Sequence, residues 1–139
     1  MTAKEYLSQI EKLDRQINEI LEEIYRLKTV AYGTTSLNDS ERVQASLKGD
    51  KLCDAVTRIV TLEQEADILT DRFCDRKADA IEHMKRLENK RYYEILYDRY
   101  INYKSIYRLA EERKSNYKNM KRLHRQALVE YQKILDIVL

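Results

Sequence analysis

The chain has 139 residues, of which 43% are hydrophobic and 36% are charged. Proline is absent and glycine occurs twice, so the tight turns of β-hairpins and phosphate-binding loops have almost no suitable residues. A chain of this length suits one domain or two small ones. These features predict an all-α protein and exclude large enzyme folds.

Positive charge is concentrated in the last third of the chain. Residues 1–88 carry 14 Lys and Arg against 18 Asp and Glu, a net charge of −4, whereas residues 89–139 carry 12 against 6, a net charge of +6. We therefore expect two domains, of which 1–88 contacts itself or another protein and 89–139 contacts a polyanion. The alternative is that both sets of charges are solvated helix surface.

A heptad repeat runs through the first helix predicted from the sequence. Its apolar positions from Tyr6 to Ala31 follow one another at steps of 4 and 3, the spacing of a coiled-coil seam. Thr2 and Glu5 can form a capping box and Gly33 can end the helix, which predicts a helix over residues 3–32. The residues expected to hold a helical hairpin or an oligomer together are Ile10, Leu13, Ile17, Ile20, Ile24 and Leu27.

A second long helix is predicted over residues 51–88. The polar segment before it, at 33–50, contains both glycines and is expected to be a flexible surface loop. Two helices that each carry a stripe of apolar residues and are joined by a loop fold most simply into a long antiparallel hairpin, a coiled coil that buries both stripes. We expect the protein to be a homodimer through this hairpin. A regulatory partner helix is the alternative occupant of the seam.

The last third of the chain predicts shorter helices. Residues 90–101 form one amphipathic pattern, Ser105 can cap a short helix, and Asn116 can cap a longer helix that runs to Ile137. Seven of the eleven tyrosines lie between Tyr92 and Tyr117. Tyr93 and Tyr100 are expected in the core, whereas Tyr107 and Tyr117 face outward and are the better candidates for contact with DNA. The inner stripe predicted for the longest helix consists of Met120, Leu123, Ala127, Tyr131 and Ile134.

A basic stripe is predicted on the same helix. Four cations share one face because they stand at i, i+3, i+4 and i+7: Lys118, Lys121, Arg122 and Arg125. A short helix, a tight turn and a longer helix with basic leading turns form the geometry by which a helix-turn-helix enters the major groove. Arg125 is placed to contact phosphate, and the residues expected to contact bases are Tyr117, Lys118, Lys121 and Arg122. An ordinary helical pair with a solvated basic face is the alternative.

Residues for catalysis or metal binding are sparse. His83 and His124 are isolated in the sequence, and Cys53 and Cys74 lack the spacing of a zinc site. His124 is expected to be a phosphate contact or a surface residue. We expect no enzyme activity, no metal and no cofactor. The sequence also contains no apolar stretch of signal-peptide or membrane-spanning length, which predicts a cytoplasmic protein that does not contact a membrane.

The C-terminal segment RYYEILYDRYINYKSIYRLAEERKSNYKNMKRLHRQALVEYQKIL resembles the helix-turn-helix of sigma-70 region 4 as it occurs in phage and prophage transcriptional regulators, the ArpU- and RinA-like group. The leading MTAKEYLSQIEKLDRQI resembles the N-terminal helix of the same proteins. The most informative pieces are Arg99-Tyr100-Ile101, Ile106-Tyr107-Arg108-Leu109-Ala110 and Arg122-Leu123-His124 with Ala127-Leu128.

This resemblance implies a DNA-binding regulator of phage genes that also contacts host RNA polymerase. The family's turn usually carries a small or flexible residue near Lys114, whereas this chain has Arg113-Lys114-Ser115, which predicts a longer or strained turn. The residues that match the start of the family's recognition helix are Asn116, Lys118, Asn119, Lys121 and Arg122.

Three hypotheses about function remain open at this point. The first is sequence-specific binding of double-stranded DNA for transcriptional control. The second is a protein-interaction module whose hairpin binds host RNA polymerase or another host protein. The third is a small terminase-like DNA-recognition subunit, which also combines such a motif with coiled-coil oligomerisation.

Overall fold

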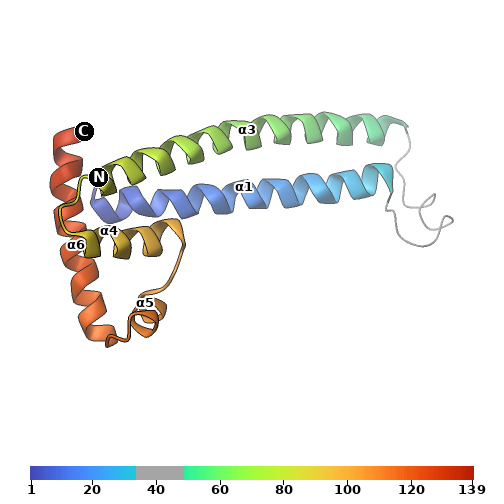
Figure 1. The fold of residues 1–139 in the computed structure, drawn as a ribbon. Helices are drawn as coiled ribbons and strands as arrows, with labels where there is room; N and C mark the ends of the chain where they lie inside the picture. Colours follow the sequence, from blue (N-terminus) through green and yellow to red (C-terminus); the bar gives the residue numbers. More distant parts are fainter. Residues whose placement is uncertain (34–48) are drawn as a thin grey trace. The chain divides into compact units, whose positions relative to one another are not determined.

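The computed structural model describes residues 1–33 and 49–139, and every regular element in these ranges is helical (Figure 1). The predicted all-α class is therefore confirmed. The elements are α1 (Ala3–Tyr32), α3 (Gly49–Lys85), α4 (Lys90–Leu96), the π-helix η1 (Tyr97–Ile101), α5 (Ile106–Glu112) and α6 (Tyr117–Val138).

The loop predicted at 33–50 differs from the structure at its C-terminal end. Gly33 follows the end of α1 with a positive φ of 77°, as a helix-ending glycine does. Gly49 and Asp50 already belong to α3, so the helix begins two residues earlier than the predicted start at 51. Positions 34–48 of the predicted loop lie outside the described residues.

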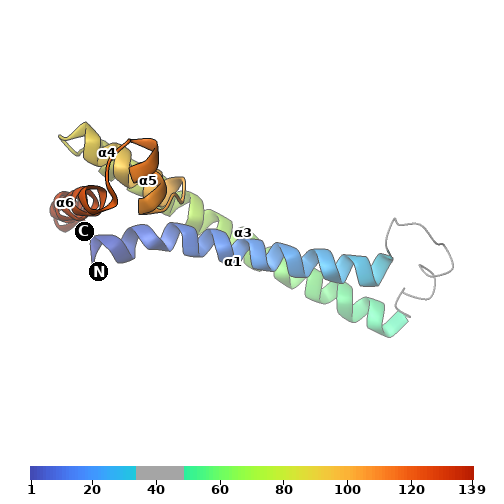
Figure 2. The same cartoon turned by 90° about the horizontal axis from the view of Figure 1, so that it is seen from below.

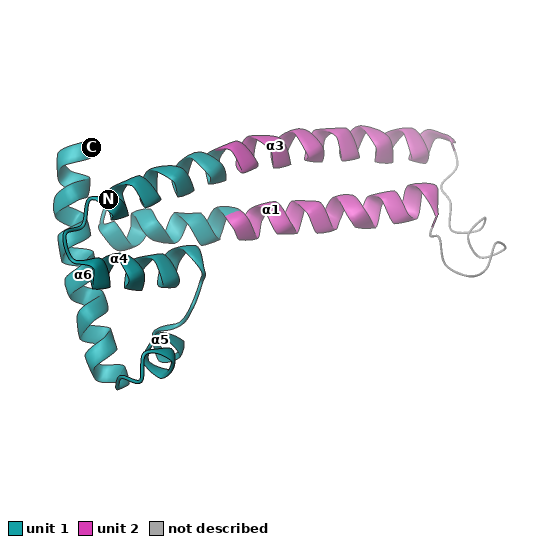
Figure 3. Ribbon diagram, viewed as in Figure 1, with its two compact units in different colours: residues 1–13, 72–139 teal, residues 14–71 magenta. Residues whose placement is uncertain are grey.

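The described helices group into two compact units. Unit 1 consists of residues 1–13 and 72–139, and unit 2 consists of residues 14–71, so that α1 and α3 contribute to both (Figure 3). The two domains predicted at 1–88 and 89–139 were divided by net charge, whereas these units are defined by contacts between residues. The predicted domains stay a prediction.

In unit 2, α1 and α3 lie side by side and run in opposite directions (Figures 1 and 2). Ile24 of α1 packs with Ile59 and Leu62 of α3, and Ile20 and Leu27 cover this cluster. These α1 residues belong to the predicted seam, because the 4 and 3 steps keep one face turned toward the neighbouring helix. Of the remaining seam positions, Ile17 is buried and Leu13 is half-buried.

The core of unit 1 contains the first turns of α1. Leu7 and Ile10 are fully buried there together with Met84 of α3, Leu96 of α4 and Tyr131 of α6. The predicted capping box starts α1: Glu5 N donates to Thr2 Oγ1 at 3.2 Å, and Thr2 N donates to Glu5 Oε2 at 2.9 Å. The backbone N–H of Ala3 also donates to Gln132 Oε1 of α6 at 2.6 Å. The first helix of the chain is thus anchored to the last.

The helix predicted over residues 51–88 ends at Lys85. Its last turn tightens, because Arg86 N donates to His83 O and Leu87 N donates to Met84 O, both at 3.1 Å. Asn89 then caps α4 by accepting a hydrogen bond from Arg91 N at 2.9 Å.

The single helix predicted over residues 90–101 is also divided. It consists of α4 followed by η1, where Asn102 N donates to Tyr97 O at 3.1 Å across five residues. A π-helical turn inserts an extra residue and rotates the side chains that follow. Tyr100 and Ile101 are consequently both buried, whereas Tyr93 is half-buried rather than in the core.

The inner face of α6 agrees with the predicted stripe up to Tyr131. Met120, Leu123, Ala127 and Tyr131 are buried, but the next buried residue is Leu135, and Ile134 is half-buried. A helix turns once every 3.6 residues, so both 134 and 135 are near the buried face and packing decides between them. α6 packs against both α4 and α5.

Candidate nucleic-acid interface

The candidate interface lies on α6, which follows α5 in the chain, and both helices are capped. The Oγ of Ser105 accepts a hydrogen bond from Arg108 N at 3.1 Å at the start of α5. The Oδ1 of Asn116 accepts one from Asn119 N at 2.6 Å at the start of α6. Both predicted N-caps are confirmed, and they define where each helix begins because they satisfy N–H groups that have no partner within the helix.

The turn between α5 and α6 contains a residue in a strained backbone conformation. Ser115 N donates to Ala110 O at 2.9 Å and Lys114 N donates to Glu111 O at 3.3 Å, which is the Schellman pattern of a helix C-terminus. The residue that must adopt the left-handed conformation in this pattern is Lys114, with φ 51°. Glycine is usual there because a Cβ costs roughly 1 kcal/mol. The strain predicted for this turn is found at Lys114.

Arg113 fastens this turn to the preceding helices. Its Nη1 donates to Glu94 Oε2 of α4 at 3.2 Å, and its Nη2 donates to Asp98 Oδ2 of η1 at 3.1 Å. Because a guanidinium presents its donors in a rigid planar fork, these two bonds restrain the end of α5 in direction as well as position. This role was not predicted from the sequence, since both carboxylates lie 15 or more residues away in the chain.

The basic face of α6 is formed by Lys118, Lys121, Arg122 and Arg125, and all four side chains are exposed. Together with Asn116 and Asn119 they line one open hollow, and none of the six lining residues carries a carboxylate. Within this face, Arg122 Nη2 donates to Asn119 Oδ1 at 2.8 Å. The structure thus gathers on one surface every predicted DNA-binding residue except Tyr117, which precedes them as the first residue of α6.

No cation of this basic face forms an ion pair within residues 1–33 and 49–139. Two acidic side chains of the same region are instead paired with other cations. Glu112 binds Lys104 and Arg108, each at 3.0 Å, and Glu130 binds Lys133 at 3.0 Å. Among the described residues, the positive charge of the basic face therefore has no ion-pair partner.

Tyr107 of α5 and Tyr117 of α6 stack on one another beside the basic face. Their ring centroids are 4.1 Å apart and the ring planes differ by 13°. Both rings are exposed, as predicted, and the Lys121 ammonium lies 6.0 Å from the centroid of the Tyr117 ring.

His124 does not take the phosphate-contact or surface position expected for it. The side chain is half-buried, its Nε2 is hydrogen-bonded to the Tyr100 hydroxyl at 2.9 Å, and the two rings are stacked. Burial, together with the charges of Arg99 and Lys4, lowers the pKa of His124 to about 4, so the ring is neutral at pH 7. The ring therefore adds no charge to the neighbouring basic face.

His83 occupies a comparable buried position. Its Nδ1 is hydrogen-bonded to the Tyr131 hydroxyl at 3.0 Å, and the rings of Tyr6 and Tyr131 lie against it. Burial lowers the pKa of His83 and raises that of Tyr131. Both histidines thus join helices within unit 1, and no local pattern in the sequence indicates either pairing.

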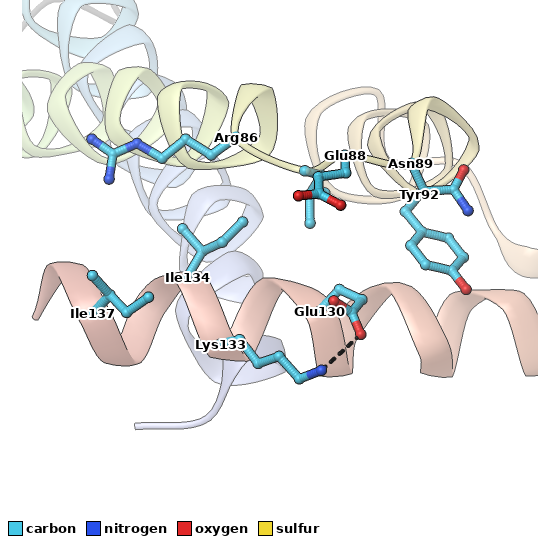
Figure 4. Close-up of a pocket in the computed structure, with 9 residues that line it drawn as sticks. Arg86, Glu88, Asn89, Tyr92, Glu130, Lys133, Ile134 and Ile137 are labelled. Carbon is cyan, nitrogen blue, oxygen red and sulfur yellow. Dashed lines mark hydrogen bonds and ion pairs between the residues drawn. The ribbon is translucent and has the colours of Figure 1, made fainter.

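A second hollow in unit 1 has a different character (Figure 4). It lies between the 86–89 connector, α4 and the last turns of α6, and its lining mixes Ile134 and Ile137 with the charged side chains of Arg86, Glu88, Glu130 and Lys133. The figure shows the Lys133 ammonium directed at the Glu130 carboxylate, to which it is bonded. Since its charges are of both signs, this hollow does not select a polyanion.

Residues for metal binding or thiol chemistry are not gathered at any site within 1–33 and 49–139. No group of three His, Cys, Asp or Glu side chains in this part of the chain is placed to hold a metal ion. Cys53 and Cys74 are both free and exposed. Among the described helices, none has an apolar stretch that would cross a bilayer.

Comparison with known proteins gives no match: no family model, no curated sequence and no solved structure matches the chain.

Proposed function

We propose that this chain is a sequence-specific double-stranded DNA-binding protein that regulates transcription of phage or prophage genes. The observation that carries the proposal is the basic face of α6, where four exposed cations share one surface and have no ion-pair partner among the described residues. Paired surface charges neutralise one another, whereas unpaired cations on one helix face are available to phosphate oxygens.

The arrangement of α5 and α6 supports major-groove binding. A short capped helix, a turn fastened by Arg113 and a longer helix with cations in its leading turns match the parts of a helix-turn-helix. In this proposal Tyr117, Lys118, Lys121 and Arg122 contact bases, Arg125 contacts phosphate, and Asn116 and Asn119 adjoin them. The protein binds DNA without catalysing a reaction on it and needs no cofactor.

The resemblance of residues 91–135 to sigma-70 region 4 of phage regulators supports the regulatory role. It also supports host RNA polymerase as a second partner and the cytoplasm as the place of action. The α1 seam supports a homodimer formed through the hairpin, in which each protomer presents one α6 to a half-site.

The proposal is tested by removing charge from the basic face. Lys121→Gln combined with Arg125→Gln should weaken binding to a duplex several-fold or more at moderate salt, measured by fluorescence anisotropy. The slope of log affinity against log salt should fall by about one unit for each phosphate that the variant no longer binds. The matched control is Lys85→Gln combined with Lys133→Gln, which removes the same charge from exposed lysines that are paired with Glu82 and Glu130.

An equal loss of affinity in both double variants would contradict a role for the basic face in particular. Unchanged affinity and salt slope in the first variant would contradict DNA binding by this surface. Sequence specificity is tested separately by selecting bound duplexes from a random-sequence pool. If no sequence is enriched, the protein does not discriminate between sequences and the proposed regulatory role fails.

A further inference from the structure

The stacked tyrosines beside the basic face have no evident role in the core. Tyr107 is 68% exposed and Tyr117 is 37% exposed, and neither belongs to the apolar clusters of unit 1. By contrast, Tyr100 and Tyr131 of the same unit are buried and bonded to histidines. Two large rings held against each other on the surface present apolar carbon that a partner can contact.

The position of the two tyrosines places their ring carbon atoms where α6 is proposed to contact the major groove of DNA. Tyr117 is the first residue of α6, and residues in the leading turns of the second helix reach base edges in a helix-turn-helix. The neighbouring hollow is lined by amide and cationic side chains alone, and the two rings beside it add apolar carbon to this surface. They therefore supply a kind of contact that the lysines and arginines do not.

Thymine is the base that such carbon would recognise. In the major groove it presents a C5-methyl group beside its O4 acceptor, whereas the other three bases present no methyl group there. The two rings come from different helices and stack at 4.1 Å, so each restrains the other before any DNA is bound. Preorganised rings lose little conformational entropy on binding.

We propose that the Tyr107–Tyr117 pair recognises thymine in duplex DNA through its 5-methyl group. The proposal rests on the proposed function, because it assigns base selectivity to the surface that is expected to contact the groove. An unpaired base would instead stack flat on a ring; the inner faces are closed to it because each tyrosine covers the other, and stacking on an outer face is an outcome that the test below distinguishes. Methyl groups at a groove edge can be reached by the rims and the outer faces of the rings.

The test compares thymine with deoxyuridine, which lacks only that methyl group. The probe is the duplex that the full-length protein enriches from a random-sequence pool, made once with thymine and once with deoxyuridine at every thymine position. The wild-type protein should bind the deoxyuridine duplex roughly fourfold or more weakly, the loss expected for one buried methyl group. Tyr117→Ala should bind the thymine duplex more weakly than the wild type and should bind both duplexes equally.

Two further variants control for folding and for the hydroxyl. Tyr117→Phe should keep the thymine preference because the ring carbon remains. Tyr25→Ala, at a 72% exposed tyrosine of unit 2, should keep both affinity and preference. Circular dichroism should show unchanged helicity in all three variants, since the substituted side chains are exposed.

Each outcome decides a different point. Equal binding of the two duplexes by the wild type would overturn thymine recognition and leave the proposed function standing. A full thymine preference in Tyr117→Ala would show that another residue reads the methyl group and would overturn the assignment to this pair. Tighter binding of the single strand than of the duplex would overturn it in favour of base stacking, and absence of duplex binding would overturn both proposals.

Discussion

The interactions inside unit 2 differ in kind from those among the C-terminal helices of unit 1. In unit 2, Ile24, Ile59 and Leu62 form an apolar cluster, and the Lys28–Glu63 ion pair across the helices is exposed and 3.8 Å long. An ion pair of this kind contributes little. In the C-terminal helices, polar contacts at defined distances add to the core, above all the fork of Arg113 and the bond of Tyr100 to His124. Regularly spaced apolar residues therefore stabilise unit 2, whereas individual polar pairs add to the stability of the C-terminal helices.

The largest effect is expected from a charge placed in the seam of unit 2. Ile24→Asp buries a carboxylate without a partner and should lower the free energy of unfolding by roughly 3–5 kcal/mol. Urea denaturation followed by circular dichroism measures this destabilisation, and hydrogen exchange should locate it in residues 14–71. The matched control is Tyr25→Asp, which adds the same charge at a neighbouring, 72% exposed position and should change stability by less than about 1 kcal/mol. Equal effects of the two changes would show that the seam does not stabilise this unit.

An intermediate effect is expected from acid, which should lower the stability of unit 1 more than that of unit 2. The folded-state pKa of His124 is about 4, below the ordinary value of 6.5, so the unfolded chain binds more protons between these values. Stability is thus fully present above pH 6.5 and falls as the pH is lowered toward 4, by at most about 1.4 kcal/mol per pH unit for one proton. Both histidines lie in unit 1, so hydrogen exchange in this window should show unit 1 losing protection before residues 14–71.

Replacing the histidine checks the cause. His124→Gln should flatten the dependence of the unfolding free energy on pH between 6.5 and 4, and His83 should account for part of what remains. A variant with the same slope as the wild type would show that protonation of His124 does not limit the stability of unit 1.

The smallest effect is expected at the turn before α6. Lys114→Gly relieves the left-handed backbone at φ 51° and should raise the free energy of unfolding by about 0.5–1 kcal/mol. Thermal unfolding should show a small increase in Tm. Lys114→Ala removes the same charge but keeps a Cβ, and it should give no such gain. A gain of equal size in the alanine variant would assign the effect to charge instead of backbone conformation.

The same contrast explains which features were predictable from the sequence. The 4 and 3 spacing from Tyr6 to Ala31, the capping box at Thr2 and the caps at Ser105 and Asn116 depend on residues within a few positions of one another. The capping box and both caps were predicted and are present, and the Ile20, Ile24 and Leu27 positions of the spacing pack in the cluster shared by α1 and α3. The basic face of α6 was predictable for the same reason, because i, i+3, i+4 and i+7 positions share a helix face whatever the rest of the chain does.

Contacts between distant residues were not predictable in this way. His83 and Tyr131 are 48 residues apart, and Tyr100 and His124 are 24 residues apart, so nothing in the local sequence indicates that they meet. The phosphate-contact or surface role expected for His124 was wrong for this reason. The π-helical turn at Tyr97–Ile101 and the burial of Leu135 in place of Ile134 likewise depend on how α6 packs against its neighbours.

The bond from Ala3 to Gln132 also bears on the order in which the chain folds. Unit 1 contains residues from the first and the last helix, because the first turns of α1 pack in a core that α6 completes. Residues 14–71 form one continuous stretch and can close as soon as α3 has been synthesised, whereas unit 1 has to wait for its last helix. The first turns of α1 therefore leave the ribosome long before their partners, with Leu7 and Ile10 still uncovered. We therefore expect unit 1, whose contacts join residues far apart in the sequence, to form more slowly than unit 2.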